Sequence, residues 1–216
     1  MAGCCPTVGC GIGRCFSRFS RRYVRRYERH GLERTQRQLV AGLGAAAIAG
    51  ASLLEIGSGV GYLHQQLLEQ GAATAVGIDL SEAMLAEAQA LALRRGLADR
   101  TRYVHGDFHE IAGTVEAADI TILDKVVCCY PDAEGLLADA ASHSKVLCAL
   151  TFPRAHWANR LGARLGVVAL RLVGSAYRPF IHDPAMIADR LQRAGFERIF
   201  AARTAFWLTW VYRRSA

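Results

Sequence analysis

Three glycines at alternate positions follow an apolar stretch in the first third of the chain. The stretch reads Leu53-Leu54-Glu55-Ile56-Gly57-Ser58-Gly59-Val60-Gly61. Because glycine has no side chain, a ligand can approach this backbone closely, and the helix expected to follow offers free N–H groups. Dinucleotide-binding proteins space such glycines as G-x-G-x-x-G, whereas Tyr62 stands at that last position here. The pattern predicts a ligand site at the end of a buried strand and disfavours a nicotinamide site.

Acidic residues mark the ends of four successive apolar stretches. Glu55 lies in the first, Asp79 ends the second, Asp107 follows the third and Asp124 follows the fourth. Ligands of open parallel sheets bind beyond the carboxyl ends of the strands, so we expect these acids to face one site. A carboxylate at Asp79 can accept hydrogen bonds from both hydroxyls of a ribose, and Phe108 adds a flat apolar ring beside Asp107. Asp79 or Asp107 alone is also typical of a helix cap, and that alternative stays open.

The elements that must position these residues follow from the apolar periodicity. Five short runs indicate strands: Ser52–Ile56, Ala75–Asp79, Thr101–His105, Ala118–Leu123 and Val146–Thr151. Four stretches indicate helices: Tyr62–Gln70, Ser81–Arg95, Pro131–Ser142 and Pro184–Ala194. Two last strands, Phe196–Arg203 and Phe206–Tyr212, are joined so closely that they must pair antiparallel. We predict an α/β fold with a doubly wound, mostly parallel seven-stranded sheet and a C-terminal antiparallel hairpin.

These motifs resemble those of the class I S-adenosylmethionine-dependent methyltransferases over about residues 50–216. The resemblance implies a Rossmann-like sheet, S-adenosyl-L-methionine as the cofactor and methyl transfer as the activity. It makes Asp79 the ribose-binding acid and Asp107-Phe108 the pair that holds the adenine. The cofactor-binding residues that it implies are Glu55, Gly57, Ser58, Gly59, Gly61, Asp79, Leu80, Asp107, Phe108 and Asp124.

A narrower resemblance concerns the class of methyl acceptor. The stretch Asp124-Lys125-Val126-Val127-Cys128-Cys129-Tyr130-Pro131-Asp132, with the Arg/Tyr-rich N-terminal arm, is similar to small bacterial methyltransferases described as like magnesium-protoporphyrin O-methyltransferase. This implies a small-molecule acceptor, with large apolar molecules among the candidates. Tyr130 is the first candidate for positioning the acceptor, although its ring can equally cover the sheet edge. Tyr27 and His30 are further catalytic candidates if the arm folds over the site.

The basic charge of the chain is confined to that arm. Residues 1–37 hold nine Arg and two Glu, whereas residues 38–216 hold 17 basic and 17 acidic residues. On a helical wheel the aromatic residues and the arginines of the arm fall on opposite faces; the aromatic face holds Phe16, Phe19, Tyr23, Tyr27 and His30. We therefore expect an amphipathic helical arm at 1–37 and a cofactor-binding domain at 38–216. The aromatic face either packs on the body or closes over an apolar acceptor as a lid, and the arginines are candidates for a membrane surface or nucleic acid.

The seven cysteines do not indicate a metal site. Cys4, Cys5, Cys10 and Cys15 contain no C-x2-C pair, and an odd total does not suit a secreted disulfide framework. No export signal stands in the sequence, so we expect a cytoplasmic protein that binds no metal.

Two other functions stay open. The Arg-rich arm would suit a nucleic-acid methyltransferase, but Asp-Lys-Val-Val-Cys-Cys-Tyr-Pro stands where base-amino methyltransferases of this fold show Asn/Asp-Pro-Pro-Tyr. A catalytically silent module that binds an adenosine cofactor and acts as a regulator would show the same cofactor motifs.

Overall fold

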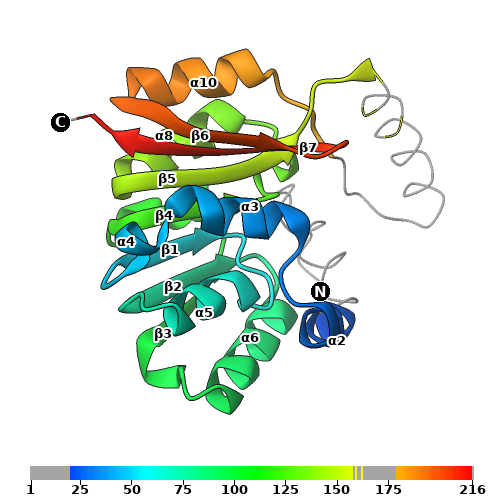
Figure 1. Ribbon diagram of the computed structural model, residues 1–216, viewed down its shortest axis with the longest axis vertical. Helices are drawn as coiled ribbons and strands as arrows, with labels where there is room; N and C mark the ends of the chain where they lie inside the picture. Colours follow the sequence, from blue (N-terminus) through cyan, green and yellow to red (C-terminus); the bar gives the residue numbers. More distant parts are fainter. Residues whose placement is uncertain (1–19, 158, 160–161, 163–178, 216) are drawn as a thin grey trace, which may run out of the picture.

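The fold is built around one mixed sheet (Figure 1). The computed structural model describes residues 20–157, 159, 162 and 179–215, and in these residues the strand order is β3-β2-β1-β4-β5-β7-β6. The strands are β1 Ser52–Ile56, β2 Thr74–Asp79, β3 Thr101–His105, β4 Ala118–Asp124, β5 Ser144–Pro153, β6 Phe196–Arg203 and β7 Trp207–Arg214. The first five pair in parallel, and β7 pairs antiparallel with both β5 and β6. The predicted Rossmann-like sheet with a C-terminal hairpin is confirmed.

Helices begin close to the positions that the sequence indicates. They are α2 Ser20–His30, α3 Arg34–Leu43, α4 Ala45–Ile48, α5 Tyr62–Glu69, α6 Glu82–Arg94, α7 Phe108–Ile111, α8 Ala133–Ser142 and α10 Pro184–Arg193, with short 3-10 turns η1 Ala98–Arg100, η2 Ala112–Thr114 and η3 Val127–Cys129. The Ser81 hydroxyl accepts a hydrogen bond from the Met84 N–H and so begins α6 as predicted. The helix expected from Pro131 begins two residues later, because the Asp132 side chain caps it.

Two apolar layers hold the helices on opposite faces of the sheet. Residues alternate along each strand, so Leu53 packs into the layer beneath α3, α4 and α5, while Leu54 packs into the layer shared with α8 and α10. Figure 1 shows α3, α4 and α5 in front of the sheet and α8 behind it. Because β1 to β5 pair in parallel, their carboxyl ends lie at the same edge of the sheet, where ligands of such sheets bind.

The N-terminal part of the described chain lies at that edge of the sheet. Helix α2 packs against α6, and α3 packs across β5, β6 and β7. The expected division between residues 37 and 38 lies inside α3, while Phe16, Phe19 and Cys4 to Cys15 lie outside the described residues. Within the described part, a membrane-crossing helix of sufficient length and apolar character is absent.

Candidate cofactor and acceptor site

A cavity of about 460 Å³ opens at the carboxyl edge of the sheet. This volume lies within the usual range for small-molecule sites. Strands β1, β2 and β4 contribute its floor, and α2 and the start of α3 contribute a wall. The lining residues are Tyr23, Tyr27, Glu33, Gln36, Glu55, Ile56, Gly57, Ser58, Gly59, Val60, Tyr62, Leu63, Ile78, Asp79, Leu80, Met84, Gly106, Phe108, Asp124, Lys125, Val126, Cys128, Cys129, Tyr130 and Trp207.

The three glycines of the loop after β1 have different surroundings. All three have positive φ, which favours glycine. A Cβ at Gly59 would meet no atom within 4 Å, so this residue presents open backbone to the cavity. A Cβ at Gly61 would lie 2.9 Å from His64 Cε1 and 3.1 Å from Ala88 Cβ, and Gly61 does not line the cavity. Gly61 therefore serves close packing between α5 and α6, and its expected role in ligand binding stays a prediction.

Asp79 ties the second strand to this loop. Its Oδ2 accepts a hydrogen bond from the Gly59 N–H at 2.8 Å, and its Oδ1 accepts one from the Ser81 N–H at 2.8 Å. Burial raises the pKa of this carboxyl, and the two backbone donors oppose that rise. Each carboxylate oxygen can accept a further hydrogen bond, so Asp79 braces the loop and remains able to bind a ligand. The next residue, Leu80, also lines the cavity.

Asp107 lies outside the lining of the cavity. Its Oδ1 accepts hydrogen bonds from the His109 N–H at 3.1 Å, as the cap of α7, and from the Tyr130 hydroxyl at 2.7 Å. The expected alternative of a helix cap therefore describes Asp107 better than a direct ligand contact, whereas the buried ring of Phe108 does line the cavity. Burial, followed by the Asp107 charge, raises the pKa of Tyr130, so its hydroxyl stays protonated and is unsuited to be a base.

Glu55 is held by a buried histidine. Its Oε2 lies 2.6 Å from His64 Nδ1, and His64 Nε2 lies 3.0 Å from the Tyr103 hydroxyl. Both side chains are almost completely buried, and burial raises the pKa of Glu55 against the opposing effect of His64. Glu55 lines the cavity, but one of its oxygens is already committed to the protein.

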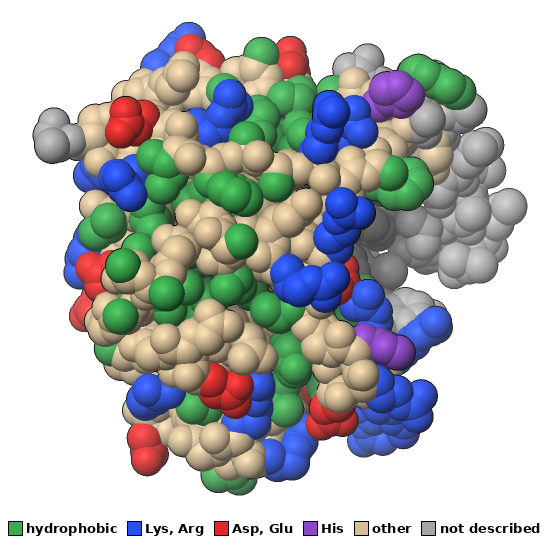
Figure 2. All heavy atoms as spheres, in the orientation of Figure 1, with side chains coloured by type: hydrophobic (Ala, Val, Ile, Leu, Met, Phe, Trp, Pro, Cys, Tyr) green, Lys and Arg blue, Asp and Glu red, His purple; other side chains and the backbone are tan. Residues whose placement is uncertain are grey.

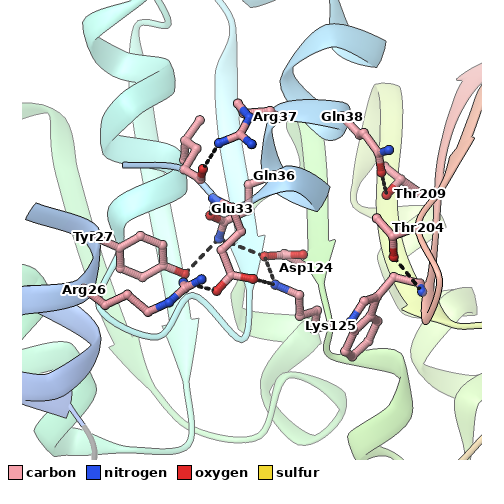
Figure 3. A network of polar contacts seen from close by, with 12 residues as sticks. Arg26, Tyr27, Glu33, Gln36, Arg37, Gln38, Asp124, Lys125, Thr204 and Thr209 are labelled. Atoms are coloured by element: carbon pink, nitrogen blue, oxygen red, sulfur yellow. Dashed lines mark hydrogen bonds and ion pairs between the residues drawn. The ribbon is translucent and has the colours of Figure 1, made fainter. Parts of the chain in front are cut away.

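A network of polar side chains joins the N-terminal helices to the end of β4 (Figure 3). Gln36 Nε2 donates to the Tyr27 hydroxyl and to Asp124 Oδ2, both at 2.9 Å. Lys125 Nζ donates to Glu33 Oε2 at 2.7 Å, and Arg26 pairs with the other oxygen of Glu33. Burial would raise the pKa of Glu33, but its bonds to Lys125 and Arg26 together lower it, so Glu33 is ionised at neutral pH.

The sequence motifs did not indicate that Glu33, Gln36 and Lys125 line the site. The spacing Glu33-x-x-Gln36 was a usable signal, because it forms the capping box that begins α3. Lys125 stands beside Asp124 in the quoted motif and has a positive φ of 61°, which is uncommon for a residue other than glycine.

Of the two catalytic candidates on the arm, the structure brings only one to the cavity. Tyr27 is buried, lines the cavity and stacks on Tyr62 with ring centroids 4.6 Å apart. His30 is exposed in the last turn of α2 and does not line the cavity. Its expected catalytic role stays a prediction. Burial raises the pKa of Tyr27, so this hydroxyl stays protonated.

Carboxyl groups outnumber cations in the lining of the cavity. Glu33, Glu55, Asp79 and Asp124 contribute carboxyl groups, and Lys125 contributes a cation. Burial raises the pKa of Asp124, and Lys125 and Gln36 oppose the rise. Asp124 Oδ1 is buried, and the carboxyl also interacts with the side chain of Thr151, which lies opposite Asp124 on β5. A ligand with positive charge would suit a cavity that is lined by more carboxyl groups than cations.

Comparison with known proteins identifies the fold and the domain. Residues 53–146 match a family model described as a methyltransferase domain. The chain thus carries a methyltransferase domain over residues 53–146. No curated protein matches the chain.

Solved structures of methyltransferases superpose on this domain over most of the chain. A magnesium protoporphyrin IX methyltransferase from Synechocystis PCC 6803 with bound SAH (S-adenosylhomocysteine) is 23% identical, with a TM-score of 0.72, over 94% of this chain and 98% of that one. An O-methyltransferase family protein from Burkholderia thailandensis is 17% identical, with a TM-score of 0.73, over 94% and 60%. An O-methyltransferase family 2 protein from Planctomyces limnophilus in complex with apigenin is 17% identical, with a TM-score of 0.70, over 94% and 61%.

The cavity of the methyltransferase domain fits its cofactor, S-adenosyl-L-methionine. The excess of carboxyl groups over cations suits a molecule that carries a sulfonium and an ammonium group. Among the described residues, no cluster of His, Cys, Asp and Glu could hold a metal ion.

The glycines of the methyltransferase domain provide a first prediction. Gly59→Val should abolish SAH binding, because the valine side chain would fill open space in the cavity. The positive φ at this position should also lower the free energy of unfolding of the variant by about 1–2 kcal/mol. Gly57→Val is the matched variant. A Cβ at Gly57 would lie 2.3 Å from Val126 Cγ2, so this variant should lose about 1–3 kcal/mol more in the free energy of unfolding. Calorimetry and urea denaturation measure the two effects, and unchanged SAH binding by Gly59→Val would contradict the location of the ligand.

Proposed function

We propose that the chain transfers a methyl group from S-adenosyl-L-methionine to a small-molecule acceptor with a large apolar part. The observation that carries this proposal is the shape of one cavity, in which the glycine loop and acids of the sheet meet an aromatic wall from α2. Tyr23 and Tyr27 belong to that wall, and they pack with Val24, Val60, Met84 and Tyr62. An aromatic wall of this kind binds apolar molecules and excludes water.

The cofactor would be held along the carboxyl edge of the sheet. In this proposal Asp79 binds the ribose hydroxyls, and the open backbone at Gly59 lets the ligand lie close to the loop. Asp124 lines the same cavity at the end of β4. Glu55, Gly57, Ser58, Leu80 and Phe108 complete the lining of this cavity. When bound, S-adenosyl-L-methionine supplies an electrophilic methyl group on a positively charged sulfur.

The protein residues act mainly by positioning. In methyl transfer the acceptor atom would bond to the methyl carbon while the carbon–sulfur bond breaks, and the electron pair of the broken bond would stay on sulfur. A carboxylate acceptor has no proton to lose, whereas a hydroxyl acceptor would give its proton to solvent. Holding the reactants in line lowers the barrier in both cases. Tyr27 and Tyr130 both keep their protons, so we assign them the roles of hydrogen-bond donor and wall, with Tyr130 also bracing Asp107.

Calorimetry tests the proposal. The chain should bind SAH and should not bind NAD, because the loop has the spacing of a methyltransferase motif and no third glycine at position 62. Transfer of a radioactive methyl group from S-adenosyl-L-methionine to a component of an apolar extract would then identify an acceptor. Binding of NAD without binding of SAH would overturn the proposal.

A further inference from the structure

Two neighbouring cysteines lie in the lining of the cavity. Cys128 and Cys129 belong to the 3-10 turn η3, a few residues after the end of β4, and both line the cavity. Cys128 is buried, whereas Cys129 is partly exposed. The proposed methyl transfer uses neither side chain, so their place in the cavity calls for a separate explanation.

The two thiols converge on one backbone oxygen. Cys128 Sγ donates a hydrogen bond to the Lys125 carbonyl oxygen at 3.3 Å, and Cys129 Sγ donates to the same oxygen at 3.8 Å. Polar side chains in a helical turn commonly bond back in this way to a carbonyl three or four residues earlier. The two side chains also interact with each other. The turn therefore brings two sulfur atoms close together at the cavity.

The chemistry of the pair is that of neutral thiols. A hydrogen bond with Cys129, followed by burial, raises the pKa of Cys128, so Cys128 keeps its proton at neutral pH. A protonated thiol is a poor nucleophile and reacts slowly with disulfides. Neighbouring thiols can nevertheless condense with a soft centre, because such centres prefer sulfur to oxygen and nitrogen ligands.

The pair offers two sulfur ligands. In the part of the chain that the structure describes, His, Cys, Asp and Glu form no group of three or more that could hold a metal ion. A fitting ligand therefore takes two sulfurs from the protein and brings its own remaining substituent. A trivalent organoarsenical meets this requirement, because its arsenic forms three bonds and one of them is to its own carbon.

We propose that Cys128 and Cys129 form a dithiol site that captures a trivalent organoarsenical in the cavity. With phenylarsine oxide, the two S–H bonds and the arsenic–oxygen bond break, and two sulfur–arsenic bonds form. The oxygen leaves as water with both thiol hydrogens. Arsenic stays trivalent, so the step requires no oxidant or reductant. The inference rests on the positions of the thiols and does not require the proposed function.

Capture would also affect the neighbouring end of β4. It removes both S–H donors from the carbonyl of Lys125, whose φ is 61° and whose Nζ binds Glu33 at 2.7 Å. The phenyl group would in addition take up part of a cavity of about 460 Å³. We therefore expect the captured arsenical to weaken SAH binding.

Peptide mapping tests the capture without any substitution. Trypsin cleaves after Lys125 and Lys145, so the peptide 126–145 contains Cys128 and Cys129 and no other cysteine. After treatment of the native chain with phenylarsine oxide, this peptide should carry one phenylarsenic group that a dithiol removes and a monothiol does not. Cys148, in the peptide 146–154, should stay unmodified, because it is fully buried on β5 and does not line the cavity.

Serine variants test whether both thiols are needed. Cys128→Ser and Cys129→Ser should each bind phenylarsine oxide at this site about 100-fold more weakly or worse, because the second sulfur–arsenic bond of the parent forms within one molecule. The variant with both substitutions is the matched control for the cavity. Phenylarsine oxide should lower the SAH affinity of the parent chain and leave that of the double variant unchanged.

The chain unfolded in urea is the positive control for the chemistry. Its peptide 126–145 should be modified, because adjacent cysteines are accessible there. If this peptide stays unmodified in the native chain, the proposal is overturned. Capture that leaves SAH affinity unchanged would overturn the location of the bound group in the cavity. Failure of the untreated chain to bind SAH would overturn the proposed function, while the peptide map would still decide this inference.

Discussion

Asp79→Ala should weaken SAH binding by roughly 1.5–3 kcal/mol, or about 10- to 150-fold. The variant removes a charged acceptor for the ribose and also releases the Gly59 N–H, which Asp79 holds at 2.8 Å. The glycine loop then loses a brace as well as a ligand contact. Calorimetric titration with SAH measures the loss.

Asp119→Ala is the matched control for this prediction. Asp119 Oδ2 also accepts two hydrogen bonds, from the Ser52 N–H at 2.8 Å and the Ser52 hydroxyl at 2.7 Å, but near the start of β4, away from the cavity. This variant should lower the free energy of unfolding and leave SAH affinity unchanged. If Asp79→Ala binds SAH as tightly as the parent, then Asp79 serves only to brace the loop.

Tyr27→Ala should detach α2 from the cavity. The ring is buried, stacks on Tyr62 and packs with Val60 and Met84, so its removal should cost about 3 kcal/mol of the free energy that holds the helix in place. We expect faster hydrogen exchange of the α2 amides and weaker binding of SAH, because Tyr27 lines the cavity. Tyr27→Phe keeps the stacked ring and should retain most of the protection of the α2 amides from hydrogen exchange.

Charge reversal of the exposed arginines tests whether the arm covers the cavity as a lid or binds a surface. Arg22, Arg25 and Arg29 are exposed and form no ion pair with a described residue, unlike Arg21 and Arg26, which pair with Glu87 and Glu33. Figure 2 shows Lys and Arg side chains gathered where α2 lies. Changing the three arginines to Glu should leave SAH binding and α2 exchange nearly unchanged, because exposed charges contribute little to stability. A surface role for the arm would be favoured if the charge-reversal variant lost binding to SAH. It would also be favoured if that variant lost binding to anionic liposomes while Tyr27→Ala left the hydrogen exchange of the α2 amides unchanged.

The alternation of short apolar runs was enough to predict the sheet and its hairpin, whereas the cofactor was implied by the resemblance of the motifs to those of class I methyltransferases. These features are local: the period of two or 3.6 residues, a Ser81 cap, and glycines that follow a strand all act within a few neighbouring residues. Parallel strands connected by helices then have few possible arrangements. The predicted ends of β1, β3 and β6 agree with the structure residue for residue.

Tertiary structure decided which of the motif residues face the ligand. Gly61 packs between helices, and Asp107 caps α7 and accepts from Tyr130, so neither lines the cavity although both belong to the motifs. A carboxylate or a glycine at the end of a strand suits a cap, a packing contact and a ligand equally. Which of these it serves depends on what other elements bring to it.

The wall formed by the N-terminal helices also required the folded chain. The periodicity of residues 16–30 indicated an aromatic face on the arm, but Gln36 and Asp124 are 88 positions apart and meet only because the first turn of α3 lies near the end of β4. Sequence by itself determined the layers, the cofactor motif and the charge of the arm, because these follow from short-range patterns. Tertiary structure alone decided that Tyr27 faces the cavity while His30 does not, and that Gln36 holds Asp124, because each depends on the position of one element against another.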